Sequence, residues 1–481
     1  MSSPQPLSSG GEHLSRRAWG ALIVLCGALF LDALDVSMIG VALPSIKTDL
    51  DMSTSSLQWV VSAYVLGYGG FLLLGGRAAD LLGRRRMFLI SLGVFIVASG
   101  LGGLANDGAL LIATRFVKGV SAAFTAPAGL SIITTSFKEG PARNRALSVY
   151  TATGATGFSL GLVFGGLLSE IGWRWVFFLP VPVALATLLA AVPLVPRDAP
   201  GSALVQRKFD IAGAVSVTTA MLLLVFTVVE APDHGWSSAR TIGGLAVAAA
   251  IFAVFVAIER RTKQPLVRLG ILRSGSLVRA NLGAMSLIGG WFGFQFMLTL
   301  YLQQTRGWSA LETGLAIFPA GAIVATLAPR VAPLIMRFGL TRVIAAGLLS
   351  TVAAYALFLP IGLDSPYVTA MLPTFILGGL GFGLAYGPLN VAATNGIAPE
   401  EQGLAGGLVN TSFQFGGALV LAIVTAVYNA NAGTTGTPQS VIDGFHAAIL
   451  VSVAVAALGA LAMAFPSRRT SAELAVEGAR S

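Results

Sequence analysis

The chain has 481 residues, of which 55% are hydrophobic and 11% are charged, and its mean hydropathy is +0.80. A soluble domain carries about 25% charged residues, so this composition cannot cover a water-facing surface and most of the surface must face lipid. Disordered, collagen-like and secreted disulfide-rich proteins are excluded too. The single cysteine, Cys26, permits neither an intrachain disulfide nor a cysteine-based metal cluster.

Apolar stretches long enough to cross a bilayer as helices follow one another along the whole chain. The runs are continuous rather than alternating, which favours helices over a β-barrel. The 58 glycines suit helices that pack closely in a membrane. We expect fourteen spans, at 18–44, 57–76, 87–105, 109–136, 146–169, 174–196, 211–230, 241–258, 278–303, 310–335, 341–362, 367–392, 404–428 and 444–465.

The distribution of basic residues predicts how these spans are oriented. If residues 1–17 are cytoplasmic, 24 of the 30 Lys and Arg residues fall on the cytoplasmic side, as the positive-inside rule requires. The net charge of +9 is then mostly explained by the orientation of the spans in the membrane. No folded domain remains that could gather basic residues on one surface and bind a nucleic acid. We predict a multi-pass protein of the cell (inner) membrane with both termini in the cytoplasm.

An internal repeat divides the chain into two halves. A shift of 256 residues places Ser53 on Ser309 and Gly83 on Gly339, as expected of a duplicated six-helix unit. We predict an all-α membrane protein with two six-helix bundles plus two inserted helices. The expected parts are a cytoplasmic tail (1–17), an N-terminal bundle (18–196), a connection with the two extra spans (197–273), a C-terminal bundle (274–465) and a second cytoplasmic tail (466–481).

Four ionisable residues lie deep within predicted spans. Asp32 and Asp35 share a face of the first span, and Arg115 and Lys118 share a face of the fourth. Their distances from the span ends pair Asp35 with Arg115 and Asp32 with Lys118. An uncompensated charge at mid-membrane costs about 3 kcal/mol or more, so such residues are functional by default. We predict a proton-coupling site; a purely structural ion-pair staple between the helices is the alternative.

A glycine- and arginine-rich segment, GRAADLLGRRR, joins the second and third spans on the cytoplasmic side, starting at Gly76. Its tight turn needs glycine, which Gly83 supplies. Asp80 can pair with Arg84, Arg85 or a neighbouring helix end. We predict a gating element; the alternative is a basic loop that only stops translocation.

Glycines also recur every fourth residue on the fifth span, at Gly157, Gly161 and Gly165. This spacing puts them on one helix face, where backbones can approach closely. A gating hinge and simple helix packing are both compatible with the pattern.

Polar and aromatic side chains supply the candidates for a substrate cavity. No acid or base lies deep in the last six spans, so the second half can offer only hydrogen bonds and aromatic surface. Most of these side chains are expected to hold helices together. The candidates are Trp59, Tyr64, Trp291, Phe294, Gln295, Asn410 and Gln414.

These motifs resemble those of the major facilitator superfamily and, within it, its fourteen-helix drug:proton antiporter branch. The segment from Gly76 is similar to the loop motif G-x-L-a-D-r-x-G-r-r, with Ala78 and Leu81 as departures. Residues 34–44, LDVSMIGVALP, resemble the first-helix motif L-D-x-T-I-V-N-V-A-L-P, with Ser37 for Thr and Gly40 for Asn.

Further motifs extend the resemblance over the whole chain. Residues 115–119 are similar to R-x-x-Q-G, with Lys118 in place of Gln. Residues 157–166 resemble the antiporter motif G-x-x-x-G-P-x-x-G-G, with Leu162 in place of proline, which keeps the glycine face but removes the kink. The remaining similar segments are 59–66, 173–177, 209–213 and 301–303.

The resemblance implies that Asp35 and Arg115 take part in proton coupling, and that Asp80 with Arg84 and Arg85 stabilises one gate state. It implies a proton-driven exporter of amphipathic or hydrophobic small molecules, cationic ones included, which rocks one bundle against the other as a monomer. A dedicated exporter of one metabolite, peptide or lipid is the nearest alternative, and a membrane sensor is the alternative of another class.

Enzyme signatures are missing from the sequence. It holds no H-E-x-x-H motif, no Walker loop and no nucleotide-binding fold pattern, so ATP hydrolysis and metal catalysis are not expected. We predict no cofactor and no metal, with the proton gradient as the energy source.

Overall fold

The computed structural model describes residues 15–137, 141–197, 210–262, 265, 267–397, 401–432 and 438–464. Within this part of the chain, fourteen helical segments are long and apolar enough to cross a membrane, as predicted. The predicted C-terminal tail and residues 1–14 of the N-terminal tail lie outside the described residues.

The first half supplies six spans. Its helices are α1 (Arg16–Asp49), α2 (Thr54–Leu82), α3 (Arg84–Gly103), α4 (Gly108–Ser136), α5 (Pro141–Ile171), α6 (Trp175–Phe178) and α7 (Pro180–Leu194). The sixth span combines α6 and α7, and Pro180 opens α7 because its ring fits the first helical position. Helix α1 continues five residues past its predicted end, with Pro44 inside it; a membrane helix tolerates such a proline where neighbouring groups satisfy the freed backbone.

Two inserted helices and a second set of six spans follow. They are α8 (Ile211–His234), α9 (Ala239–Arg261), η2 (Leu269–Arg273), α10 (Gly275–Leu300), η3 (Tyr301–Thr305), α11 (Ala310–Leu327), η4 (Ala328–Arg330), α12 (Val331–Phe338), α13 (Leu340–Leu357), η5 (Tyr367–Met371), α14 (Leu372–Thr394), α15 (Gln402–Asn431) and α16 (Pro438–Ala464). The tenth span joins α11, η4 and α12, and the twelfth joins η5 and α14.

Equivalent positions in the two halves have the same local structure. Ser53 caps α2 by accepting a hydrogen bond from a backbone N–H of the first turn, and Ser309 caps α11 in the same way. Gly83 before α3 and Gly339 before α13 have φ of 99° and 86°, a region that favours glycine. The four residues that the predicted repeat pairs therefore have matching local structures.

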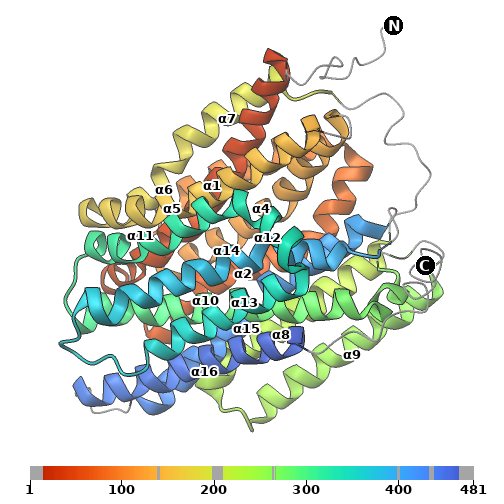
Figure 1. Cartoon of the computed structure of the whole chain (residues 1–481). Helices are drawn as coiled ribbons and strands as arrows, with labels where there is room; N and C mark the ends of the chain where they lie inside the picture. Colours follow the sequence, from red (N-terminus) through yellow and green to blue (C-terminus); the bar gives the residue numbers. More distant parts are fainter. Residues whose placement is uncertain are drawn as a thin grey trace, which may run out of the picture.

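Helix neighbours show how the halves are assembled (Figure 1). Helix α1 packs on α5 and α2 on α4, while α10 packs on α15 and α13 on α14. The halves meet along α2–α15 and α5–α11. Helix α8 packs on α9 and also contacts both α2 and α15, so the inserted pair covers one seam between the halves.

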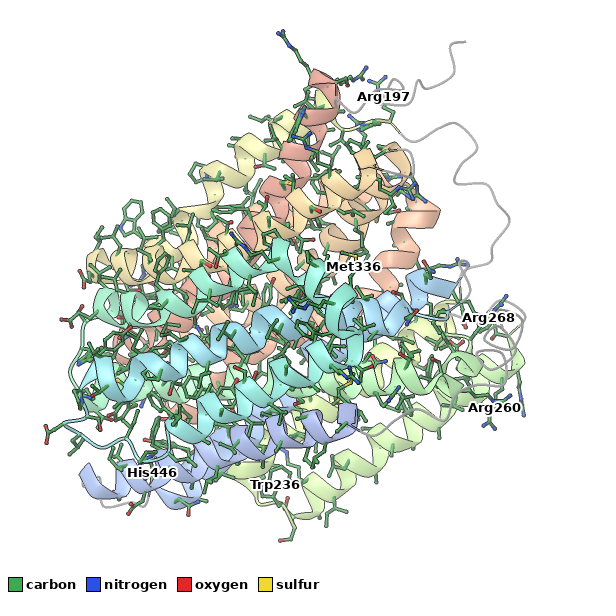
Figure 2. All side chains as sticks on the ribbon, viewed as in Figure 1. Arg197, Trp236, Arg260, Arg268, Met336 and His446 are labelled. Atoms are coloured by element: carbon green, nitrogen blue, oxygen red, sulfur yellow. The ribbon has the colours of Figure 1, made fainter. Side chains whose placement is uncertain are left out.

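The two membrane sides can be told apart by the helix ends. We call the side on which α1 begins the proximal side and the opposite one the distal side. Helices α1 and α7 reach the proximal side at the top of Figure 1, whereas α9 reaches it at the right. Figure 2 shows Arg197, Arg260 and Arg268 towards the proximal ends, and Trp236 and His446 away from them.

Candidate functional site

A buried carboxylate held by two basic side chains lies between α1 and α4. Arg115 donates to Asp35 Oδ2 at 2.5 Å, and Lys118 Nζ donates to Asp35 Oδ1. The relative exposure of Asp35 and Lys118 is 0%, and that of Arg115 is 1%. The structure therefore brings together three of the four charged residues predicted as a site.

The predicted ladder of two separate ion pairs is wrong, because Lys118 pairs with Asp35 rather than Asp32. Helical side chains lean towards the N-terminus of their own helix. Helices α1 and α4 run in opposite directions, so Asp35 leans towards the proximal side and Lys118 towards the distal side. The two side chains converge on one level, which leaves Asp32 without a basic hydrogen-bond partner among the described residues.

Backbone and aromatic groups surround both cations. The Arg115 Nε donates to the carbonyl of Val60 at 2.9 Å, and its guanidinium lies 4.5 Å from the centre of the Tyr64 ring. The Lys118 Nζ donates to Ser99 Oγ at 3.1 Å and lies 4.6 Å from the centre of the Phe95 ring. Such cation–π contacts stabilise a desolvated cation by about 2 kcal/mol, so the bases are fixed in place.

Asp32 lies one turn nearer the proximal side than Asp35 and has different surroundings. Its Oδ1 accepts a hydrogen bond from the Tyr64 hydroxyl, and its side chain is partly exposed. The two acids and two bases together are neutral. Among the described residues, no group of three or more His, Cys, Asp or Glu side chains could hold a metal ion.

We call Asp32, Asp35, Arg115 and Lys118 together the charged centre. A small cavity of about 20 Å³ lies next to it, between Arg115 and residues of α1, α2 and α10. This is enough space for one water molecule. Arg115, Tyr64 and Gln295 contribute its polar lining. A Cβ at Gly40 would lie 2.7 Å from Gln295 Nε2, so the missing side chain there makes room for the amide. Gln295 is thus the predicted second-half residue that approaches the charged centre.

Two of the predicted cavity residues point elsewhere. Trp59 donates to Glu230 of α8 at 3.4 Å and packs on Phe226, because the inserted helix covers that face of α2. Phe294 is 1% exposed and stacks on Tyr355 within the second half. In the described conformation neither side chain lines the small cavity next to Arg115.

The other second-half candidates lie at or near the seams. Trp291 contacts Phe158 of α5 across the seam, with ring centres 6.3 Å apart. Gln414 packs closely on Gly69 of α2: a Cβ added at Gly69 would lie 2.9 Å from the Cβ of Gln414. Asn410 is partly exposed and donates to the carbonyl of Gly406 at 2.8 Å.

The predicted gating segment joins α2 to α3 on the proximal side. Gly76 lies inside α2, and Gly83 makes the turn with its positive φ. Arg85 Nη2 donates to the carbonyl of Val192 near the end of α7 at 2.6 Å, where a cation is favourable. Arg84 is partly exposed, and the side chain of Asp80 lies outside the described residues.

The three glycines of α5 form a continuous contact with α1. Added Cβ atoms at Gly157, Gly161 and Gly165 would lie within 2.6 to 2.7 Å of backbone atoms of α1. Helix α5 runs unbroken past Leu162, as expected where the motif proline is missing. The glycines thus serve close packing in this conformation.

Polar contacts link the two halves on the distal side. Gln303 Nε2 donates to the carbonyl of Val41 at 2.9 Å, and Asn429 donates to Ser55 Oγ at 3.2 Å. The N–H of Leu311 donates to Glu170 at 3.4 Å. These contacts close the distal side of the molecule.

Several residues around the charged centre escaped sequence reasoning. Ser99, Phe95 and the Val60 carbonyl have no pattern that predicts their role. Tyr68 packs edge-on against the Tyr64 ring, with centres 6.1 Å apart. It could have been found, because it follows Tyr64 by four residues and so shares its helix face.

Comparisons with known proteins agree with this architecture. The family model described as Major Facilitator Superfamily matches residues 25–421. The chain is 37% identical to "Puromycin resistance protein pur8" of Streptomyces alboniger, over 95% of this chain and 93% of that protein. It is 36% identical to "Cephamycin export protein CmcT" of Amycolatopsis lactamdurans, over 95% of each. Its fold is similar to that in the "In meso crystal structure of the POT family transporter PepTSo", with TM-score 0.66, 18% identity and coverage of 92% of this chain and 97% of that one.

Proposed function

Because the chain belongs to the major facilitator superfamily, a family of transporters rather than enzymes, we propose that it is a proton-coupled exporter of amphipathic and hydrophobic small molecules. It is a multi-pass membrane protein related to drug and antibiotic export proteins of the fourteen-helix type. The coupling ion, the substrate class, the orientation and the roles of single residues are the proposed part.

The observation that carries the proposal is Asp35, fully buried between Arg115 and Lys118. Adding a proton to Asp35 would leave two cations facing a neutral acid in a medium of low dielectric constant. Such an imbalance is costly, so the protonation state biases how α1 and α4 are arranged. Gln295 of α10 lies next to Arg115, and α10 packs on α1. A change in the arrangement of α1 and α4 can therefore be transmitted to the second half.

Alternating access would be a rocking of residues 18–196 against 274–465 within one monomer. The distal contacts at Val41, Ser55 and Glu170 would open in one state. With the proximal side in the cytoplasm, as the basic residues favour, these contacts lie on the outer side of the membrane. Gly76, Asp80, Gly83, Arg84 and Arg85 would stabilise one gate state, and the glycines of α5 would let α1 slide.

The test is substrate-driven proton flux in proteoliposomes that contain the full chain. Ethidium serves as the probe, with wild type, Asp35→Asn and the exposed control Asp364→Asn. We expect flux in wild type and control, and loss of at least about tenfold in Asp35→Asn, because the carboxylate that exchanges the proton is gone. Equal flux in wild type and Asp35→Asn contradicts the role of Asp35.

A dedicated exporter of one compound is the second candidate. It is supported by the names of two relatives, each of which refers to a single antibiotic class. Export of one compound from a chemically varied panel, with no flux of the others, would favour this candidate over broad drug export. Absence of flux for every compound would favour a membrane sensor.

A further inference from the structure

Gln295 of α10 is a buried amide of the second half that lies beside the charged centre of the first. It is the polar residue that the second half contributes to the lining of the small cavity next to Arg115. Its relative exposure is 5%, and its Nε2 has no hydrogen-bond partner among the described residues. A buried polar group without a partner is costly, so the amide does not serve stability in this conformation.

Helix α1 has a glycine at the point where Gln295 approaches it. A Cβ at Gly40 would lie 2.7 Å from Gln295 Nε2, so any side chain at this position would displace the amide. The first-helix motif that residues 34–44 resemble has asparagine here. An amide that the motif places on the first half is therefore replaced, in this chain, by an amide from the second half.

The protonation state of Asp35 decides which acceptors Arg115 has. With Asp35 ionised, Arg115 donates to Asp35 Oδ2 at 2.5 Å and to the Val60 carbonyl at 2.9 Å. A proton on Asp35 removes the negative charge and leaves a buried cation that needs another acceptor. The cavity of about 20 Å³ is lined by both Arg115 and Gln295 and gives these side chains room to move towards each other.

The other polar neighbours of Arg115 are already engaged. The Val60 carbonyl accepts from Arg115 Nε. The Tyr64 hydroxyl donates to Asp32, and the face of its ring already lies against the guanidinium. Among the described residues that line the cavity, the amide oxygen of Gln295 is therefore the side-chain acceptor still available to Arg115.

The charged groups that face Arg115 all belong to the first half. They are Asp32 and Asp35 of α1 and Lys118 of α4. Asp32 accepts from Tyr64 and from neither base, so its titration affects Arg115 less directly than that of Asp35. In the described parts of α2, α3, α5 and α10, charged residues lie only near the helix ends.

We propose that Gln295 is a positioning residue for proton coupling: its amide oxygen accepts a hydrogen bond from Arg115 when Asp35 is protonated, and not when Asp35 is ionised. This bond joins α4 of the first half to α10 of the second. Uptake of a proton thereby draws the two halves together at mid-membrane, and release of the proton lets them part. The inference rests on the proposed proton-coupled export and names the residue through which the second half responds.

The test is a distance between the halves, measured in the full chain as a function of pH. Cys26→Ala removes the single native cysteine. Nitroxide labels can then be attached to Leu104→Cys and Leu363→Cys, at exposed positions on the distal side of each half. We expect the ratio of the two distance populations to change by at least about tenfold between about pH 5 and about pH 8 in this parent chain, and by less than about twofold when Asp35→Asn is added.

Variants at Gln295 and Gly40 separate coupling from packing. Gln295→Leu removes the acceptor, so the change with pH should fall below about threefold while the unfolding midpoint is kept. Gly40→Asn combined with Gln295→Ala moves the amide from α10 to α1, into the same half as Arg115, and the change with pH should stay equally small. Gln402→Leu, at an exposed glutamine of α15, is the matched control and should keep the full change.

Three results would overturn the inference: a parent chain whose distances do not respond to pH, a full response in Gln295→Leu, or a response recovered by Gly40→Asn with Gln295→Ala. If Gln295→Leu matches the parent chain while Asp35→Asn stops ethidium-driven proton flux, the role of Gln295 is wrong and proton-coupled export stands. If the response depends on Gln295 but wild type carries no proton flux with ethidium, the role of Gln295 stands and the proposed transport is wrong.

Discussion

The two halves of the molecule differ at equivalent helices. In the first half, α1 and α4 carry Asp32, Asp35, Arg115 and Lys118 at mid-span. In the second half, α14 carries no charged residue, and α10 carries only Arg279 near its proximal end. The second half approaches the charged centre with an amide, Gln295.

The helix packing, in contrast, is shared. Gly161 of α5 packs against the backbone of Leu34 on α1, and Gly416 of α15 packs against the backbone of Met285 on the equivalent helix α10. Both halves thus have close glycine contacts between equivalent helices, whereas, among α1, α4, α10 and α14, charged residues lie at mid-span only in α1 and α4. A charge is costly in a membrane interior and is kept where it is used, whereas close packing is needed wherever helices cross.

The largest effect on stability is expected from Asp35→Asn, which removes the acid that both buried bases of the first half bind. Asp35→Asn leaves Arg115 and Lys118 buried with a single nearby acid, and loss of one partner of a buried ion pair costs about 3–5 kcal/mol. The thermal unfolding midpoint in detergent should fall clearly. Adding Lys118→Gln restores neutrality and should recover part of the loss. An unchanged midpoint in Asp35→Asn would show that the ion pairs do not stabilise the fold.

An intermediate effect is expected from the shared glycine contacts. Gly161→Ala and Gly416→Ala each push a methyl group into a neighbouring backbone, and overpacking of this kind costs about 1–3 kcal/mol. Both should lower the unfolding midpoint. Gly100→Ala on α3 is the control, because nothing lies within 4 Å of its added Cβ. If only one of Gly161→Ala and Gly416→Ala is destabilised, the halves do not share this packing.

The smallest effect, of opposite sign, is expected at Gln295. Its Nε2 is buried without a hydrogen-bond partner among the described residues, and an unpaired buried polar group costs about 1–3 kcal/mol. Gln295→Leu should therefore keep or slightly raise the unfolding midpoint. Ser286→Ala provides the contrast, since the Ser286 hydroxyl donates to Val455 at 2.8 Å and its loss should lower the midpoint by about 1 kcal/mol. Equal losses in both would mean that the Gln295 amide does have a partner.

The number of spans, the turns at Gly83 and Gly339, and the few charged residues deep in the spans were predictable from the order of residues. Each of these depends on properties that are local to the chain: hydrophobicity, the distribution of charge, and turn glycines such as Gly83 and Gly339. The membrane sharpens these signals, because it makes every buried charge expensive.

Which side chains meet depends on how the helices pack. Lys118 joins Asp35 because antiparallel helices tilt their side chains towards each other, and Trp59 turns to α8 because an inserted helix covers that face. Helices that are apolar on every side carry no stripe that fixes their rotation, so the contacts of a particular residue follow from packing and not from the order of residues along the chain.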